Sequence, residues 1–83
     1  MRVTVQLFAR LRELAGCSRC EIQVPDGSSV EDVWRALAER HPALGPFAGA
    51  VSCAVNTDFA RMQTTVLDGD EVAFLPPVSG GSC

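Results

Sequence analysis

The fold is decided by residues 28–42, SSVEDVWRALAERHP. The apolar side chains of this stretch recur at helical spacing and form one stripe, made of Val30, Val33, Trp34, Leu37 and Ala38. Ser28 and Glu31 have the spacing of a capping box, in which each side chain bonds the other residue's backbone N–H. Pro42 ends the pattern, because the residue before a proline disfavours helical geometry. We therefore predict one amphipathic helix that packs on an apolar surface.

Segments that alternate polar and apolar residues flank this helix on both sides. The alternation predicts strands at 2–7, 20–24, 51–55 and 71–75. Residues 59–67 fit either a short strand or an irregular connection, and residues 44–49 are predicted to be a loop. A helical turn over 9–15 is predicted to end at Gly16.

The order of these elements is strand, strand, helix, strand, short strand, strand. It predicts the α+β class and a β-grasp (ubiquitin-like) fold, with a mixed sheet of four to five strands packed on one main helix. Residues 1–77 are expected to form this domain. Residues 78–83 are expected to form a flexible tail that carries Gly80-Gly81.

Length and charge exclude several classes of function. A chain of 83 residues can build one modest core and has little interior for an enclosed active site, so we expect no enzyme activity from the chain alone. The net charge of −3 and the scattered arginines argue against nucleic acid as a partner. No apolar run approaches the ~20 residues that span a bilayer, and the chain begins without the pattern of a signal peptide. A cytoplasmic location without membrane contact is the expectation.

Four cysteines are present, two of them as Cys17-Ser18-Arg19-Cys20. This CxxC spacing occurs in zinc and redox sites, but a structural zinc site needs a second pair at a regular spacing. No metal site is therefore predicted. Cys20 alternates in phase with Ile22 and Val24, which favours a core thiol.

The strand phases place two apolar residues away from the core. Phe8 follows the inward Leu7, and Leu75 follows the inward Phe74. The first and last strands of a β-grasp sheet are neighbours, so these outward side chains are expected to form one exposed apolar patch for a partner protein, with Arg12 at its border. The alternative is that the helical turn over 9–15 covers Phe8.

The chain after the last strand has features that suit acyl activation. Pro76-Pro77 ends the strand and stiffens the base of the tail. Gly80-Gly81 lacks side chains and can thread a narrow channel. A terminal glycine carboxylate can attack the α-phosphate of ATP without crowding by a β-carbon. The chain has no Walker-type loop, so a partner enzyme must bind the ATP and the chain itself is expected to bind no cofactor.

Residues 68–81, DGDEVAFLPPVSGG, resemble the C-terminal signature of the sulfur-carrier (small) subunit of molybdopterin synthase. Residues 7–16, LFARLRELAG, and residues 54–56, AVN, resemble other parts of that ubiquitin-like sulfur-carrier family. The resemblance implies that an adenylating and sulfurating enzyme system converts Gly81 to an acyl-adenylate and then to a thiocarboxylate. It also implies a heterotetramer with the large synthase subunit, in which Gly81 donates sulfur to a pyranopterin precursor and Gly80 is its slender neighbour. The partner-binding residues expected are Phe8, Arg12, Leu75, Pro76, Pro77 and Val78.

The sequence departs from this family pattern after Gly81. Ser82 and Cys83 follow, so the Gly81 carbonyl is held in a peptide bond. Three hypotheses remain open: a peptidase removes the two residues, the chain has lost its carrier function, or Cys83 carries sulfur as a persulfide. Two other functions also remain open, a ubiquitin-like protein modifier and a thiocarboxylate carrier for cysteine or thiazole synthesis.

Overall fold

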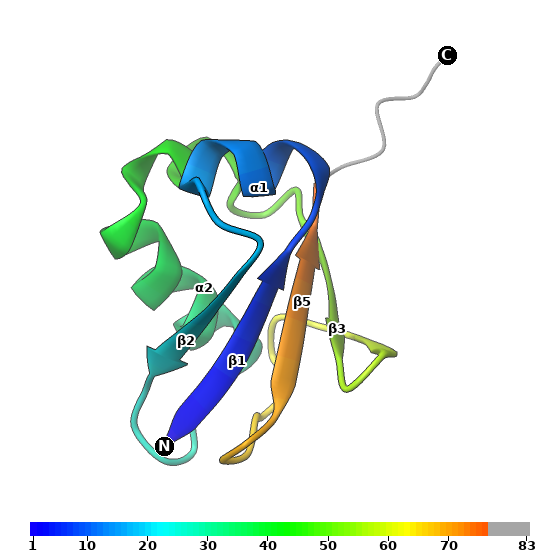
Figure 1. The fold of residues 1–83 in the computed structure, drawn as a ribbon. Coiled ribbons are helices and arrows are strands. Elements are labelled where there is room, and N and C mark those ends of the chain that lie inside the picture. The colour runs from blue at the N-terminus through cyan, green and yellow to red at the C-terminus, as the bar shows by residue number, and fades with distance from the viewer. Residues whose placement is uncertain (77–83) are drawn as a thin grey trace.

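The computed structural model describes residues 1–76, which form one mixed sheet with helices on one face (Figure 1). In chain order the elements are β1 (Arg2–Leu7), α1 (Ala9–Ala15), β2 (Arg19–Gln23), α2 (Val30–Arg40), the 3₁₀ helix η1 (Pro42–Phe47), β3 (Ser52–Val55), β4 (Asp58–Ala60) and β5 (Glu71–Leu75). The predicted boundary at residue 77 and the predicted tail lie outside the described residues.

The sheet contains five strands in the order β2-β1-β5-β3-β4. β1 and β5 are parallel neighbours, and the other pairs are antiparallel. The first and last strands therefore lie side by side at the centre of the sheet (Figure 1). The predicted α+β class and β-grasp arrangement are confirmed.

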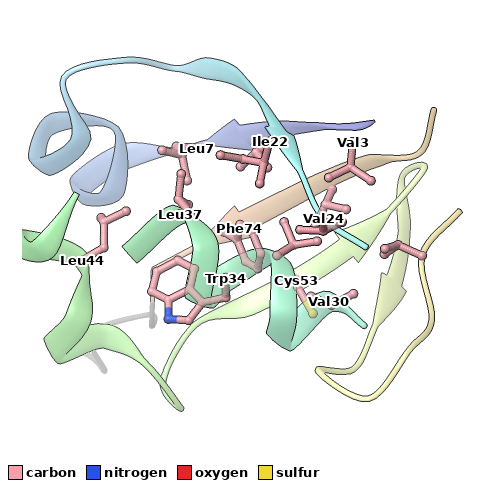
Figure 2. Packing of buried hydrophobic residues seen from close by; sticks show 14 of the residues in the cluster. Val3, Leu7, Ile22, Val24, Val30, Trp34, Leu37, Leu44, Cys53 and Phe74 are labelled. Atoms are coloured by element: carbon pink, nitrogen blue, oxygen red, sulfur yellow. The ribbon is translucent and has the colours of Figure 1, made fainter. Parts of the chain in front are cut away.

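The core lies between the sheet and α2, as Figure 2 shows. The inward residues of β1 and all of the predicted stripe of α2 except Ala38, which is half-buried, are fully or almost fully buried: Val3, Val5, Leu7, Val30, Val33, Trp34 and Leu37. Trp34 packs edge-on against Phe74 of β5, with ring centroids 4.9 Å apart and an interplanar angle of 62°. Aromatic pairs in this geometry add to the stability gained from burial alone. The face of the sheet opposite to α2 remains available for other contacts.

The capping box of α2 lies one residue later than predicted. Ser29 is the N-cap, and its backbone N–H donates to the Asp32 carboxylate at 2.9 Å, while the Asp32 N–H donates to the Ser29 hydroxyl at 3.4 Å. The hydroxyl of Ser28 is turned elsewhere and donates to the Pro25 carbonyl at 2.7 Å. The Ser28 carbonyl also accepts from the Val66 N–H at 2.9 Å. These contacts hold Ser28 outside the helix, so the predicted Ser28–Glu31 pairing is wrong.

The observed capping box predicts that alanine substitutions at two neighbouring acidic residues lower the free energy of unfolding by different amounts. Asp32→Ala is expected to lower the free energy of unfolding by about 1 kcal/mol, because it removes a partner from the N-cap. Glu31→Ala removes only a surface pair with Arg35 at 3.5 Å, which is typically worth about 0.3–0.5 kcal/mol. Urea unfolding of both variants measures the difference. A larger loss of stability for Glu31→Ala than for Asp32→Ala would instead support the Ser28–Glu31 capping box predicted from the sequence.

Two connections differ from the sequence prediction or complete it. The segment predicted as a loop over 44–49 is largely the 3₁₀ helix η1, which buries Leu44 against the core. The segment left open over 59–67 begins in the short strand β4 and continues irregularly to a bridge between Thr65 and Ser29. Both segments obtain their geometry from partners that are distant in sequence.

Cys53 of β3 is buried and donates from its thiol to the Ala60 carbonyl at 3.3 Å. Burial raises the pKa of the Cys53 thiol above its ordinary value of 9.0. Above that pH the unfolded chain has lost a proton that the folded chain retains, so the free energy of unfolding must fall as pH rises. We expect Cys53→Ala to be less stable near neutral pH but to show a shallower decline between about pH 8 and 10. Urea unfolding across that range measures the slope, and an unchanged slope in the variant would contradict this assignment.

Candidate functional site

An apolar depression of about 280 Å³ lies on the face of the sheet opposite to α2. Three large side chains line it: Phe8, Phe59 and Leu75, with exposed fractions of 42%, 89% and 36%. Its other lining residues are Gln6, Ala54, Thr57, Glu71 and Ala73. Large apolar side chains that stay exposed together on a small domain often mark a surface for a partner protein.

The strand register explains why these side chains meet. Gln6 of β1 is opposite Ala73 of β5, and Ala73 is in turn opposite Ala54 of β3. Ala54 is also opposite Phe59 of β4. The outward residues therefore form one row across four strands. The two alanines at the centre of this row leave space that larger side chains would fill, so the sequence itself hollows the sheet here.

Phe8 is held at the edge of this depression by the start of α1. Its backbone is extended, with φ −125° and ψ 153°, and it is the N-cap residue of the helix. Ala9 follows with a positive φ of 51°, which turns the chain out of β1 and into α1. The exposure of Phe8 shows that α1 does not cover it. The predicted arrangement of Phe8 and Leu75 on one patch is therefore what the structure shows, while the role of that patch remains a prediction.

The sequence did not identify Phe59, although it is the most exposed large apolar residue of the depression. β4 contains three residues, which is too short for an alternating pattern to be recognised. Phe59 acquires its place only through its pairing with Ala54. An available clue is the aromatic residue two positions after the turn at 56–57, because antiparallel pairing after a tight turn brings such a residue back beside β3.

Polar groups border the depression on the β2 side. The Arg19 guanidinium contacts the Glu71 carboxylate at 3.1 Å, and Glu71 itself lines the depression. Arg12 lines an adjoining hollow of about 250 Å³ together with Phe8, Ser18 and Arg19. Arg12 is exposed and has no ion pair within residues 1–76. An acidic group on a partner protein could therefore form an ion pair with Arg12 beside the apolar depression.

The described part of the chain ends close to this surface. β5 ends at Leu75, whose side chain lines the depression, and Pro76 follows it with partial exposure. Of the predicted site residues, the structure brings Phe8, Arg12 and Leu75 to the depression and its adjoining hollow. Pro76 follows Leu75 directly in the chain but does not line either of them. The remaining predicted site residues, Pro77, Val78, Gly80 and Gly81, lie outside the described residues.

Metal-binding clusters and membrane-spanning helices are both absent from the described part of the chain. Residues 1–76 contain no group of three or more His, Cys, Asp or Glu side chains that could hold a metal ion. None of the helices in the same range has the length and apolar character needed to cross a bilayer.

Comparison with known proteins agrees with this geometry. The ThiS family matches residues 5–81. The molybdopterin synthase sulfur carrier subunit of Chlamydomonas reinhardtii is 37% identical over 83 residues, covering 98% of this chain and 100% of the relative. The crystal structure of small archaeal modifier protein 1 from Haloferax volcanii has a TM-score of 0.87 at 31% identity, covering 98% of this chain and 100% of that chain.

A third similarity comes from a complex. A chain of the Helicobacter pylori complex between subunits 1 and 2 of molybdopterin-converting factor has a TM-score of 0.67 at 27% identity. The match covers 98% of this chain and 100% of that chain. Similarity therefore extends over nearly the whole sequence and includes the glycine pair. The chain belongs to the ThiS family, the family of ubiquitin-like sulfur carriers that the resemblance in its sequence predicted.

Proposed function

We propose that this chain is the sulfur carrier, and so the small subunit, of a molybdopterin synthase. The observation that carries the proposal is the extent of the family match, which runs from β1 to Gly81 and ends there. The match thus includes both the folded domain and the glycine that would carry sulfur. Relatives named molybdopterin synthase sulfur carrier subunit match over the same length.

The proposed chemistry takes place at the Gly81 carboxylate in partner active sites. An adenylating enzyme binds ATP, the carboxylate attacks its α-phosphate, and pyrophosphate leaves. A sulfurtransferase system then replaces the AMP with sulfur, which gives the thiocarboxylate. This end enters the large synthase subunit and donates its sulfur to the pyranopterin precursor. The domain supplies binding and positioning in this cycle, and the partners supply the catalytic groups.

The apolar depression is the proposed docking surface for the large subunit. Phe8, Phe59 and Leu75 are the exposed anchors that a partner can bury, and exposed aromatic residues often dominate binding energy. Arg12 is the proposed charged contact at the rim. The complex of the two Helicobacter pylori subunits supports a large-subunit partner for a chain of this fold.

Removal of Ser82-Cys83 is a required step in this proposal. A peptidase that cuts after Gly81 would free the carboxylate that adenylation needs. The family match stops at Gly81 and leaves the last two residues unmatched, which makes Gly81 the last residue of the family pattern. Loss of carrier function and a persulfide on Cys83 are the competing hypotheses.

Complementation tests the proposed function. Cells that lack their own molybdopterin synthase sulfur carrier are expected to regain molybdoenzyme activity when they express the full chain. A chain cut back to residue 80 is the matched control and is expected to restore none, because it lacks the reacting glycine. Failure of the full chain in cells that also supply its own partner enzymes would contradict the proposal.

A protein modifier is the second candidate, favoured by the fold match to small archaeal modifier protein 1. Modification would use the same adenylate but join Gly81 to lysines of other proteins. The chain has no lysine, so a copy already attached offers no side-chain amine for a second one. Slower-migrating conjugates in cells, with molybdoenzyme activity unaffected by deletion, would favour the modifier. A deletion that impairs cysteine or thiazole synthesis instead would assign the carrier to that pathway.

A further inference from the structure

The CxxC segment between α1 and β2 has no part in the proposed function. Cys17 lies just after Gly16, which ends α1 with a positive φ of 78°, and Cys20 is the second residue of β2. Both thiols are free and only partly buried. Cys20 packs against the core without being enclosed by it, so the predicted core thiol is only partly correct. Cys53, in contrast, is buried.

The backbone holds the two cysteines in a defined turn. The Ser18 carbonyl accepts from the Leu7 N–H at 2.9 Å, and β2 then pairs with β1 through Arg19 opposite Gln6 and Cys20 opposite Val5. The pKa of the Cys20 thiol is raised, first by burial and then by the neighbouring Cys17. Cys17 and Cys20 are free, partly exposed thiols three residues apart, on a segment whose backbone is fixed by its bonds to β1.

We infer that Cys17 and Cys20 form a reversible disulfide, which makes the α1–β2 turn an oxidative modification site of this domain. The oxidant is a small disulfide such as oxidised glutathione. The Cys17 thiolate attacks one sulfur of the oxidant, forms a mixed disulfide and releases one reduced thiol. Cys20 loses its proton and attacks the Cys17 sulfur, which closes the Cys17–Cys20 bond and releases the second thiol. The oxidant accepts two electrons, and the two cysteines lose two protons.

The order of attack follows from the surroundings of the two thiols. Burial keeps Cys20 protonated to a higher pH than an ordinary thiol, which makes it the poorer first nucleophile. Cys20 nevertheless lies only three residues from Cys17 in the same turn and can resolve a mixed disulfide there. A ring closed by neighbouring partly exposed cysteines is accessible to reductants, and such bonds are the labile ones. Ser18 and Arg19, the two residues between the cysteines, line the same hollow as Phe8 and Arg12. Oxidation would therefore restrain the backbone at the edge of the proposed docking surface.

Tryptic mapping tests this inference without ambiguity, because each cysteine falls in a different tryptic peptide. Cleavage after arginine separates Cys17 in 13–19 from Cys20 in 20–35, and leaves Cys53 in 41–61 and Cys83 in 62–83. The native full chain is incubated with oxidised glutathione, free thiols are alkylated, and the digest is analysed by mass spectrometry. We expect most of the protein to yield peptide 13–19 linked to peptide 20–35, and this link to disappear after treatment with dithiothreitol.

Variants and an internal control make the result decisive. Cys20→Ser is expected to stop at a stable glutathione adduct on Cys17, whereas Cys83→Ser is expected to leave the link unchanged. Alkylation of Cys53 only after denaturation shows that the domain remained folded. A stable glutathione adduct on Cys17 of the unaltered chain, or a link from either cysteine to peptide 62–83, would overturn the inference.

Discussion

A chain that ends at Gly81 is expected to form an acyl-adenylate with its partner adenylating enzyme and ATP, whereas the chain that retains Ser82-Cys83 is expected to form none. The reason is covalent, because the Gly81 carbonyl in the longer chain belongs to an amide and offers no carboxylate oxygen to attack the α-phosphate. The expected effect is all or none. ATP–pyrophosphate exchange with purified partner enzyme measures it directly.

A chain that ends at Ser82 is the matched control for this experiment. It carries a free carboxylate on the same domain, but the carboxylate belongs to a residue with a β-carbon and lies one position further along. We expect exchange near background for this chain. Equal exchange by the full chain and the Gly81-ended chain, in the absence of a peptidase, would show that processing is not needed.

Phe8→Asp is expected to weaken binding to the large subunit by at least about thirtyfold. The substitution places a charge in the apolar depression, and losing a buried aromatic anchor commonly costs about 2–4 kcal/mol in binding. The fold is expected to survive, because Phe8 is the N-cap of α1 and aspartate is a favoured N-cap residue. Isothermal titration with the purified large subunit measures the affinity, and thermal unfolding of the variant checks the fold.

Leu67→Asp is the control for the Phe8 experiment. Leu67 is also a large apolar residue with high exposure, 67%, but it does not line the depression. The same kind of charge introduced there is expected to leave binding within about twofold, as for surface changes outside an interface. An unchanged affinity for Phe8→Asp, or equal losses for both variants, would remove the depression as the docking surface.

Local patterns in the sequence predicted most of the architecture. The apolar stripe on α2 and the alternation in β1 and β5 each reflect which side chains face the core. A short window of sequence is enough to recognise these patterns. The closing residue Gly16 was also predictable, because the left-handed backbone at the end of α1 favours glycine. The outward positions of Phe8 and Leu75 follow from the same alternation, because the first and last strands of a β-grasp sheet are neighbours.

Distant contacts decided what the sequence left open or assigned wrongly. The sequence is compatible with two capping boxes, Ser28 with Glu31 or Ser29 with Asp32. The hydrogen bond between Ser28 and Val66 selects the second one. Phe59 joins the site only because β4 pairs with β3. A strand of three residues is too short for its sequence to predict that pairing. Likewise, η1 gains its place from the burial of Leu44 against the core and not from its own proline-rich sequence.

The central claim is that Gly81 becomes a thiocarboxylate after the last two residues are removed. The intact mass of the protein isolated from its native cells tests this most directly. We expect a species that lacks Ser82-Cys83 and in which one oxygen of the Gly81 carboxylate is replaced by sulfur. This species should be absent from cells that lack the adenylating enzyme, where the shortened chain should end in an ordinary carboxylate. A chain that keeps both Ser82 and Cys83 under all these conditions would contradict the account.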